Sequence, residues 1–110
     1  MRRGEIWSAA AGAGYVGKPR PVAIIQDDRF DATSSVTVCA FTTGLTDAPL
    51  LRQPVEPSPE NGLTQPSNLM IDKVTTVRRN KLGERIGILS SEDLLRLDRS
   101  ITVFLGLAGR

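Results

Sequence analysis

The sequence contains no histidine, and this absence removes several kinds of chemistry. Without an imidazole there is no Ser–His or Cys–His nucleophile, no histidine base and no histidine metal ligand. A single cysteine, Cys39, cannot form an intrachain disulfide or a thiolate-rich zinc site. Because a chain without disulfides fits a reducing compartment, we expect a cytoplasmic protein.

Long apolar runs are also missing. None approaches the roughly 20 residues that span a bilayer, and the opening Met-Arg-Arg-Gly-Glu leads into no signal-peptide stretch. We therefore expect a soluble protein that does not enter a membrane. Its 110 residues, 40% of them apolar, are enough for one domain over residues 1–110 and too few for two.

Charge of either sign is modest, with a net charge of +2 and a pI of about 9.1. The basic residues are unevenly chosen, however, because 11 of the 14 are arginine. Arginine binds phosphate through a planar fork of donors, but a GC-rich genome produces the same excess. Composition alone leaves both interpretations open.

Short stretches rich in β-branched residues, separated by segments with glycine and proline, predict strands. A C-terminal helix is expected after Ser90, which resembles the start of a capping box with Asp93, and should end at Gly106 or Gly109. Together these elements indicate an α+β fold, a small antiparallel β-barrel covered by a helix. The expected strands are residues 4–10, 21–26, 35–42, 51–56 at an edge, 68–77 and 83–89, and the expected apolar helix face is Leu94, Leu97, Ile101, Phe104 and Leu105.

The polar segment 26–34 is expected to join two of these strands as a hairpin. Lys18 and Arg20 each precede a proline, which favours extended backbone, and their spacing of two turns both side chains to one face. Pairing centred near residue 31 places Arg20 beside Thr42. The spacing therefore predicts that an arginine at the start of one strand lies beside a threonine at the end of its partner strand.

Gly12, Gly14 and Gly17 satisfy the G-x-G-x-x-G pattern of dinucleotide sites. Such a site requires a helix that begins at the motif, whereas Pro19 and Pro21 favour extended chain. We interpret residues 11–18 as a loop, either beside a binding face or simply a flexible connector.

Four stretches of the chain carry a family resemblance: Arg3-Gly-Glu-Ile-Trp7, Lys18-Pro-Arg-Pro-Val-Ala-Ile-Ile25, Val38-Cys-Ala-Phe-Thr-Thr43, and Leu82-Gly-Glu-Arg-Ile-Gly87 followed by Leu89-Ser-Ser-Glu-Asp-Leu94. In this order and within this length they resemble the MazF/PemK family of toxin endoribonucleases, over essentially the whole chain. The resemblance implies an SH3-like small antiparallel β-barrel with a C-terminal α-helix. It also implies a homodimer that cuts single-stranded RNA at short sequences without metal or other cofactor and is neutralised by a MazE-like antitoxin. DNA is not an expected partner of the toxin alone.

By this resemblance, Arg20 matches the family's catalytic arginine and Thr42 its catalytic threonine. The implied reaction is attack of a ribose 2′-hydroxyl on the adjacent phosphorus, which leaves a 2′,3′-cyclic phosphate and a 5′-hydroxyl. Arg20 would stabilise the charge that develops on the phosphate, and Thr42 would donate a hydrogen bond to a phosphoryl oxygen. The further candidates for substrate contact are Tyr15, Lys18, Thr43 and Asp72.

The sequence departs from one branch of the family, in which a histidine acts together with an Arg-x-Asp on a later strand. Here the loop before Arg20 contains Tyr15 and no histidine, and the later strand reads Met70-Ile-Asp72, so the aspartate is present without the arginine. Asp72 could orient Arg20, contact a base, or hold a loop or the dimer in place. Because arginine is a poor acid, water is left as a proton source for the leaving oxygen.

Two other functions stay open at this point. A CcdB-like gyrase poison on the same fold would bind a protein target, and an inactive relative would bind only RNA or its antitoxin. Two local features also have structural explanations: Trp7 could stack on a base but is more typical of a core. A basic segment could follow an RNA backbone or be a solvated turn; it comprises Arg78, Arg79, Lys81 and Arg85.

Overall fold

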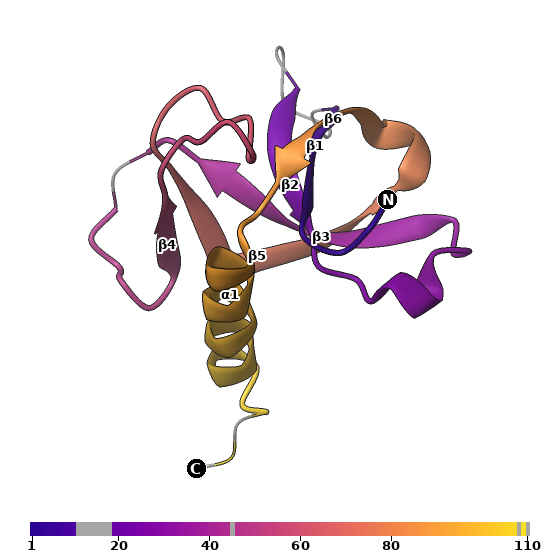
Figure 1. Ribbon diagram of the computed structural model, residues 1–110. Coiled ribbons are helices and arrows are strands. Elements are labelled where there is room, and N and C mark those ends of the chain that lie inside the picture. Colours follow the sequence, from indigo (N-terminus) through magenta and orange to yellow (C-terminus); the bar gives the residue numbers. More distant parts are fainter. Residues whose placement is uncertain (11–18, 45, 108, 110) are drawn as a thin grey trace.

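The computed structural model describes residues 1–10, 19–44, 46–107 and 109 (Figure 1). Its strands form one antiparallel sheet in the order β4-β5-β3-β2-β1-β6, with β4 and β6 at the edges. Each predicted strand is present, with ends within about two residues of those expected. The elements are β1 (Glu5–Ala9), β2 (Arg20–Ile24), the 3-10 helix η1 (Asp28–Phe30), β3 (Ser35–Thr42), β4 (Arg52–Val55), β5 (Ser67–Arg78), the 3-10 helix η2 (Arg79–Lys81), β6 (Leu82–Ile88) and α1 (Ser91–Phe104).

The predicted hairpin is formed by β2 and β3. Val22 is opposite Ala40 and Ile24 is opposite Val38, so the pairing is centred on residue 31, as predicted. The connection contains η1, whose N-terminus is capped by the side chain of Asp27. The spacing of apolar and polar residues was therefore sufficient to set this register.

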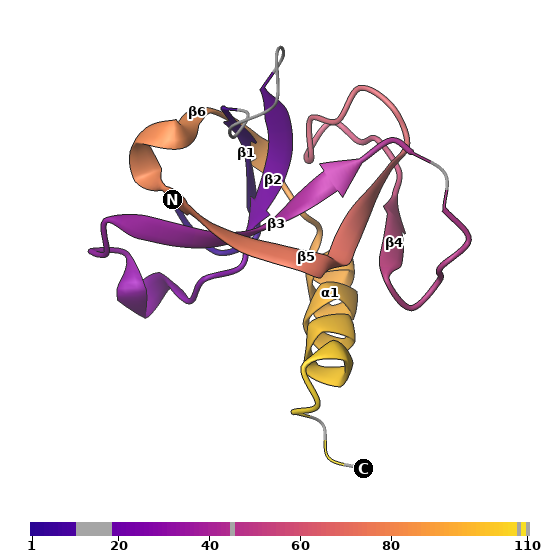
Figure 2. The same cartoon turned by 180° about the vertical axis from the view of Figure 1, so that it is seen from behind.

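Both faces of the sheet are buried, and β3 contributes to both. Cys39 and Phe41 belong to a core that also contains Leu97 of α1, whereas Val36 and Val38 belong to a second core on the other face. Residues of β1, β2, β3 and β6 converge on this second core because the sheet curls strongly (Figures 1 and 2). Trp7 packs against it, which confirms the interpretation of Trp7 as a core residue.

The segment that follows β4 reaches across to β6 and completes the barrel-like shape. The carbonyl oxygen of Glu60 accepts a hydrogen bond from the Ile88 N–H at 2.9 Å. Gly62 has φ +70°, and a Cβ there would overlap the carbonyl oxygen of Ile86; a Cβ at Gly87 would overlap that of Glu60. Two glycines therefore let a loop and a strand edge approach closely, although the sheet ladder itself stays open between β4 and β6 in the described part of the chain.

Helix α1 begins as predicted, because the Ser90 hydroxyl accepts a hydrogen bond from the Asp93 N–H at 3.0 Å. Leu94, Leu97 and Ile101 pack on the core beneath the helix. The predicted apolar face of the helix is wrong at its C-terminal end. Phe104 and Leu105 are 47% and 58% exposed, because the last turn extends beyond the sheet (Figure 1).

Gly106 ends the helix at φ +74°, as one of the two predicted stops. In the described part of the chain, no helix is long and apolar enough to cross a membrane.

Candidate active site

Arg20 begins β2, and its side chain is exposed. The pairing of β2 with β3 runs to Val22 opposite Ala40, and two residues further along each strand lie Arg20 and Thr42. Residues two apart in a strand share a face. Continuing this register places Arg20, at the start of β2, and Thr42, at the end of β3, at the same end of the hairpin and on the same face of the sheet, in agreement with the predicted hairpin.

Thr42 ends β3, and its hydroxyl is already oriented by the backbone. The Gly44 N–H donates a hydrogen bond to Thr42 Oγ1 at 3.1 Å. This bond occupies an oxygen lone pair, so the hydroxyl proton can be donated to a ligand. A Cβ on residue 44 would approach Oγ1 to 3.3 Å, so glycine at this position keeps the hydroxyl uncrowded.

The other predicted contact residues divide into two groups. Thr43 follows Thr42 directly and is exposed. Tyr15 and Lys18 lie outside the described residues. Among the described residues, no group of three or more carboxylate, thiol or imidazole side chains could hold a metal ion.

Asp72 lies on β5 and pairs with an arginine that the sequence analysis did not single out. Arg52 Nη1 on β4 donates a hydrogen bond to Asp72 Oδ1 at 2.6 Å, and the two side chains are only 13% and 28% exposed, respectively. This hydrogen bond holds the pKa of Asp72 below its usual 3.8. The arginine absent from residue 70 is thus supplied by the neighbouring strand, since Arg52 is the ladder partner of Met70.

The signal that could have found Arg52 was present but insufficient. Residues 51–56 were expected to form an edge strand, yet the partner strand and register could not be read from a segment rich in proline. The position of Asn68 could not be predicted for the same reason. Asn68 is opposite both Thr42 and Pro54 and thus shares their face.

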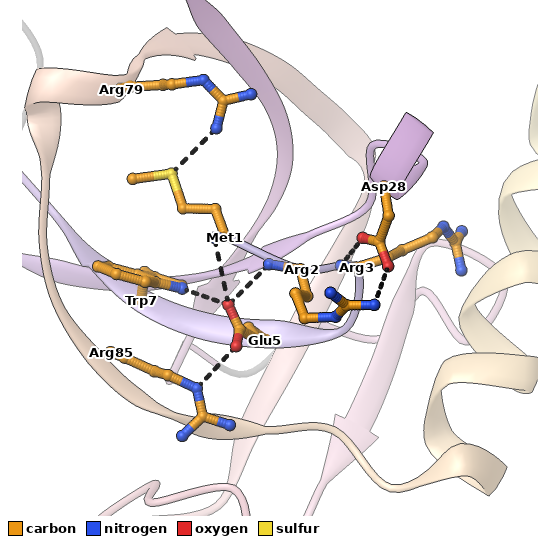
Figure 3. Close-up of polar contacts among 8 residues, drawn as sticks. All are labelled: Met1, Arg2, Arg3, Glu5, Trp7, Asp28, Arg79 and Arg85. Atoms are coloured by element: carbon orange, nitrogen blue, oxygen red, sulfur yellow. Dashed lines mark hydrogen bonds and ion pairs between the residues drawn. The ribbon is translucent and has the colours of Figure 1, made fainter. Parts of the chain in front are cut away.

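The basic segment after β5 is largely engaged within the protein. Arg79 donates hydrogen bonds to the carbonyl oxygens of Thr33 and Phe30. Arg85 Nε donates to Glu5 Oε2 at 2.9 Å (Figure 3). Two of the four basic residues therefore have structural partners, and Arg78 and Lys81 are exposed.

Glu5 is the centre of a polar cluster that joins two of the stretches behind the family resemblance. Its carboxylate accepts hydrogen bonds from the Arg2 N–H at 2.7 Å, from Trp7 Nε1 at 3.1 Å and from Arg85 (Figure 3). The first stretch thereby contacts the Leu82–Gly87 stretch through one partly buried carboxylate. These residues stabilise the fold beside β1 and β6.

Comparison with known proteins decides the family. The family model described as "PemK-like, MazF-like toxin of type II toxin-antitoxin system" matches residues 2–105. This chain belongs to the PemK/MazF toxin family. The resemblance noted from the sequence is therefore confirmed.

Individual relatives in the PemK/MazF family agree along the whole chain. A protein of Mycolicibacterium smegmatis named "Probable endoribonuclease MazF" is 63% identical over 109 residues, which cover 99% of this chain and 100% of the relative. "Endoribonuclease MazF" of Staphylococcus epidermidis is 27% identical over 97% of this chain and 92% of its own.

Solved structures of the family share the fold. "Mycobacterium tuberculosis toxin MazF-mt6" matches with a TM-score of 0.76 and 28% identity, covering 92% of this chain and 95% of that one. "Endoribonuclease in complex with its cognate antitoxin from Mycobacterial species" matches with a TM-score of 0.76 at 22% identity, covering 97% and 96%. The expected barrel with a C-terminal helix is the fold of these toxins.

Proposed function

We propose that this protein is an endoribonuclease toxin of a type II toxin–antitoxin system that cuts single-stranded RNA at short sequences. The observation that carries the proposal is the β2–β3 register, which places Arg20 and Thr42 at one end of the hairpin and on one face, in a chain 63% identical to a probable endoribonuclease. A cation and a hydroxyl donor side by side suit the binding of one phosphodiester.

The proposed reaction uses the RNA's own nucleophile. The 2′-oxygen attacks the neighbouring phosphorus, the bond from phosphorus to the 5′-oxygen breaks, and the products are a 2′,3′-cyclic phosphate and a 5′-hydroxyl. Arg20 neutralises the charge that grows on the phosphoryl oxygens, and Thr42 donates a hydrogen bond to one of them. The 2′-hydroxyl loses its proton to solvent, and the leaving 5′-oxygen takes one from water.

Substrate contact extends beyond these two residues. Thr43 is exposed beside Thr42, and Asp72 lies on the strand adjacent to β3. We assign both, with Lys18 and Tyr15, to binding of the nucleotides that flank the cut. A carboxylate accepts hydrogen bonds from base edges, which single-stranded RNA leaves accessible.

The proposed partners follow the family. One solved relative is described as being in complex with its cognate antitoxin, and we propose that a MazE-like antitoxin neutralises this protein in the same way. We further propose that the toxin is a homodimer and acts in the cytoplasm, where its RNA substrate is found. Light scattering of the purified protein measures the oligomeric state directly.

The nucleophile is tested with a chemically altered substrate. The purified protein is expected to cut single-stranded RNA in the presence of EDTA. Replacing the one ribose at the cut site by deoxyribose should stop cleavage, because the attacking 2′-oxygen is then absent. Cleavage of the deoxy-substituted strand would contradict the mechanism. A separate test in cells distinguishes a gyrase poison: if expression of the protein blocks DNA supercoiling and leaves total RNA intact, the protein acts on gyrase instead.

The role of Arg20 is tested by substitution. Arg20→Ala should abolish cleavage while the protein stays folded and keeps its oligomeric state, because the side chain is exposed and lies outside the core. Arg29→Ala is the matched control, since Arg29 is exposed in the connection at the opposite end of the same hairpin, where it pairs with Asp27. A near-normal rate for Arg20→Ala would remove this residue from the site.

A further inference from the structure

The strand that carries Asp72 departs from regular pairing at this residue. Cys39 of β3 is opposite Val74, but Phe41 is opposite Leu69, so residues 70–73 of β5 face the single β3 residue Ala40. Such an interruption of the ladder, like a β-bulge with several extra residues, changes the directions of the side chains in it. Ala40 lies two residues before Thr42 in β3, on the same face. The bulge therefore brings Asp72 toward the part of β3 that leads into the proposed active site.

Arg52 shares this face of the sheet. On β5, Leu69 and Ile71 are buried in the core beneath α1, so Met70 and Asp72 lie on the opposite face. Arg52 is the ladder partner of Met70, and ladder partners share a face. Thr42, opposite Asn68, lies on that face too. One face thus carries the proposed catalytic threonine and the Arg52–Asp72 pair.

The contacts of Arg52 hold its guanidinium in one orientation. Nη1 donates to Asp72 Oδ1 at 2.6 Å and to the Leu51 carbonyl oxygen at 2.8 Å. Nε is buried without a hydrogen-bond partner in the described part of the chain. A buried N–H without a partner is costly and calls for a reason other than stability. Arg52 therefore maintains one specific contact with Asp72 at some expense to the fold.

Apart from the backbone N–H of Asp72 itself, the described hydrogen bonds to this carboxylate come from Arg52 alone, so the carboxylate retains capacity for a further donor. An ionised carboxylate accepts through both oxygens, and Oδ1 is the one that receives the Arg52 bond. We propose that Arg52 is a positioning residue: it fixes the Asp72 carboxylate so that Oδ2 accepts a hydrogen bond from the amino group of an RNA base beside the cut. Adenine, cytosine and guanine carry such a group and uracil does not. The inference rests on the proposed ribonuclease function, and it explains how the enzyme would prefer certain bases beside the cut.

The charges around Asp72 give this role a measurable signature. Arg52 faces the carboxylate from β4, Lys73 is its neighbour on β5, and both lower its pKa. The nearby thiol of Cys39 on β3 is neutral, since burial raises its pKa to about 12. Removing Arg52 therefore raises the pKa of Asp72, and the carboxylate is lost at a higher pH than in the native protein.

The experiment compares full-length wild type with Arg52→Met, Arg52→Lys and Asp72→Asn. Each is incubated with a randomised single-stranded RNA pool, the cut ends are sequenced, and kcat and KM are measured across pH on one cleaved sequence. Arg52→Met should lower kcat/KM by about 10- to 100-fold. It should also weaken the preference for an amino-bearing base at one flanking position by about tenfold and move the acid limb of kcat/KM to higher pH, because the pKa of Asp72 is no longer lowered by Arg52. Arg52→Lys should restore part of each effect.

Two further variants separate positioning from mere stability. Arg52→Met combined with Asp72→Asn removes both charges together, so no buried charge is left alone; if Arg52 acts through Asp72, this double variant should cut no more slowly than Asp72→Asn. Arg96→Met removes a more exposed ion pair, since Arg96 contacts Asp93 at 2.7 Å on α1, and should leave the cut sequence and pH profile unchanged.

The outcomes distinguish this inference from the proposed function. An unchanged base preference and an unchanged acid limb in folded Arg52→Met, or further loss in the double variant, would overturn the role of Arg52 while RNA cleavage by the wild type stands. Absence of RNA cleavage by the wild type would overturn the proposed function itself. Native-like melting of each variant, Arg52→Met included, excludes misfolding as the cause of its loss.

Discussion

At the scale of single residues, the proposed site depends on two side chains with different chemistry. Arg20 brings a permanent charge, and Thr42 brings a neutral hydroxyl whose direction is set by the Gly44 N–H. A charge attracts the phosphate in the ground state and in the transition state, whereas an oriented donor strengthens as the oxygen charge grows. Loss of Thr42 should therefore affect turnover more than binding.

This difference can be measured with Thr42→Val, which keeps the shape and removes the hydroxyl. We expect kcat to fall by about 10²- to 10³-fold with little change in KM, because one donor to the transition state is lost. Thr42→Ser restores the hydroxyl and should recover most of the rate. Single-turnover kinetics on a short RNA provide the measurement, and a valine variant as fast as the serine variant would exclude the hydroxyl from the reaction.

At the scale of elements, β1 and β6 are joined by more than their ladder. The Glu5 carboxylate is 12% exposed and binds the start of the chain, Trp7 and Arg85 (Figure 3). Burial by itself raises the pKa of Glu5, but the hydrogen bonds from Arg2, Trp7 and Arg85 outweigh it and leave the pKa below 4.5. The motif residues of these two strands are thus coupled by one ionised side chain.

The pH dependence of stability follows from the direction of this shift. Because the pKa of Glu5 is lower in the folded than in the unfolded protein, its contribution is fully present above about pH 4.5 and is lost as pH falls through the folded value. Glu5→Gln should lower the free energy of unfolding by about 2 kcal/mol at pH 7. The difference from wild type should shrink below pH 4.

Denaturant titrations of wild type and Glu5→Gln at several pH values measure this effect. Glu84→Gln is the control, since Glu84 is an exposed carboxylate on β6, and it should change stability little at any pH. A constant difference between Glu5→Gln and wild type from pH 3 to 7 would mean that the charge of Glu5 does not stabilise the fold.

At the scale of the whole molecule, the barrel-like shape depends on one non-local contact. The loop at residues 58–62 lies against β6, where Gly87 meets the backbone of Glu60 and Asn61. Figures 1 and 2 show this loop reaching from the β4 side of the sheet toward β6. Because the atoms that a Cβ would meet belong to backbone, side-chain rotation cannot relieve the overlap.

Gly87→Ala should therefore separate the loop from β6. We expect a loss of about 2 kcal/mol in stability and a melting temperature lower by roughly 8 °C. Gly83→Ala on the same strand is the matched control, because the atom its Cβ would meet is the side-chain hydroxyl of Ser8, whose rotation costs only its hydrogen bond from the Glu84 N–H. Equal melting temperatures for the two variants would show that the loop adapts.

Features that depend on residues close together in the chain could be predicted from the sequence. Prolines at 19 and 21, β-branched residues in 35–42 and a polar connection between them specify the β2–β3 hairpin, whose register places Arg20 and Thr42 at the same end. The cap at Ser90 is equally local. In each case, the regular geometry of a strand or a helix determines where residues a few positions apart in the sequence lie relative to each other.

The tertiary structure alone decided the contacts between distant segments. The Arg52–Asp72 pair requires the register of β4 on β5, and Glu5 meets Arg85 across 80 positions of sequence. Phe104 and Leu105 have the spacing of a core face but lie beyond the sheet. These features depend on how whole strands pair and where the sheet ends, and no spacing within a single segment contains that information.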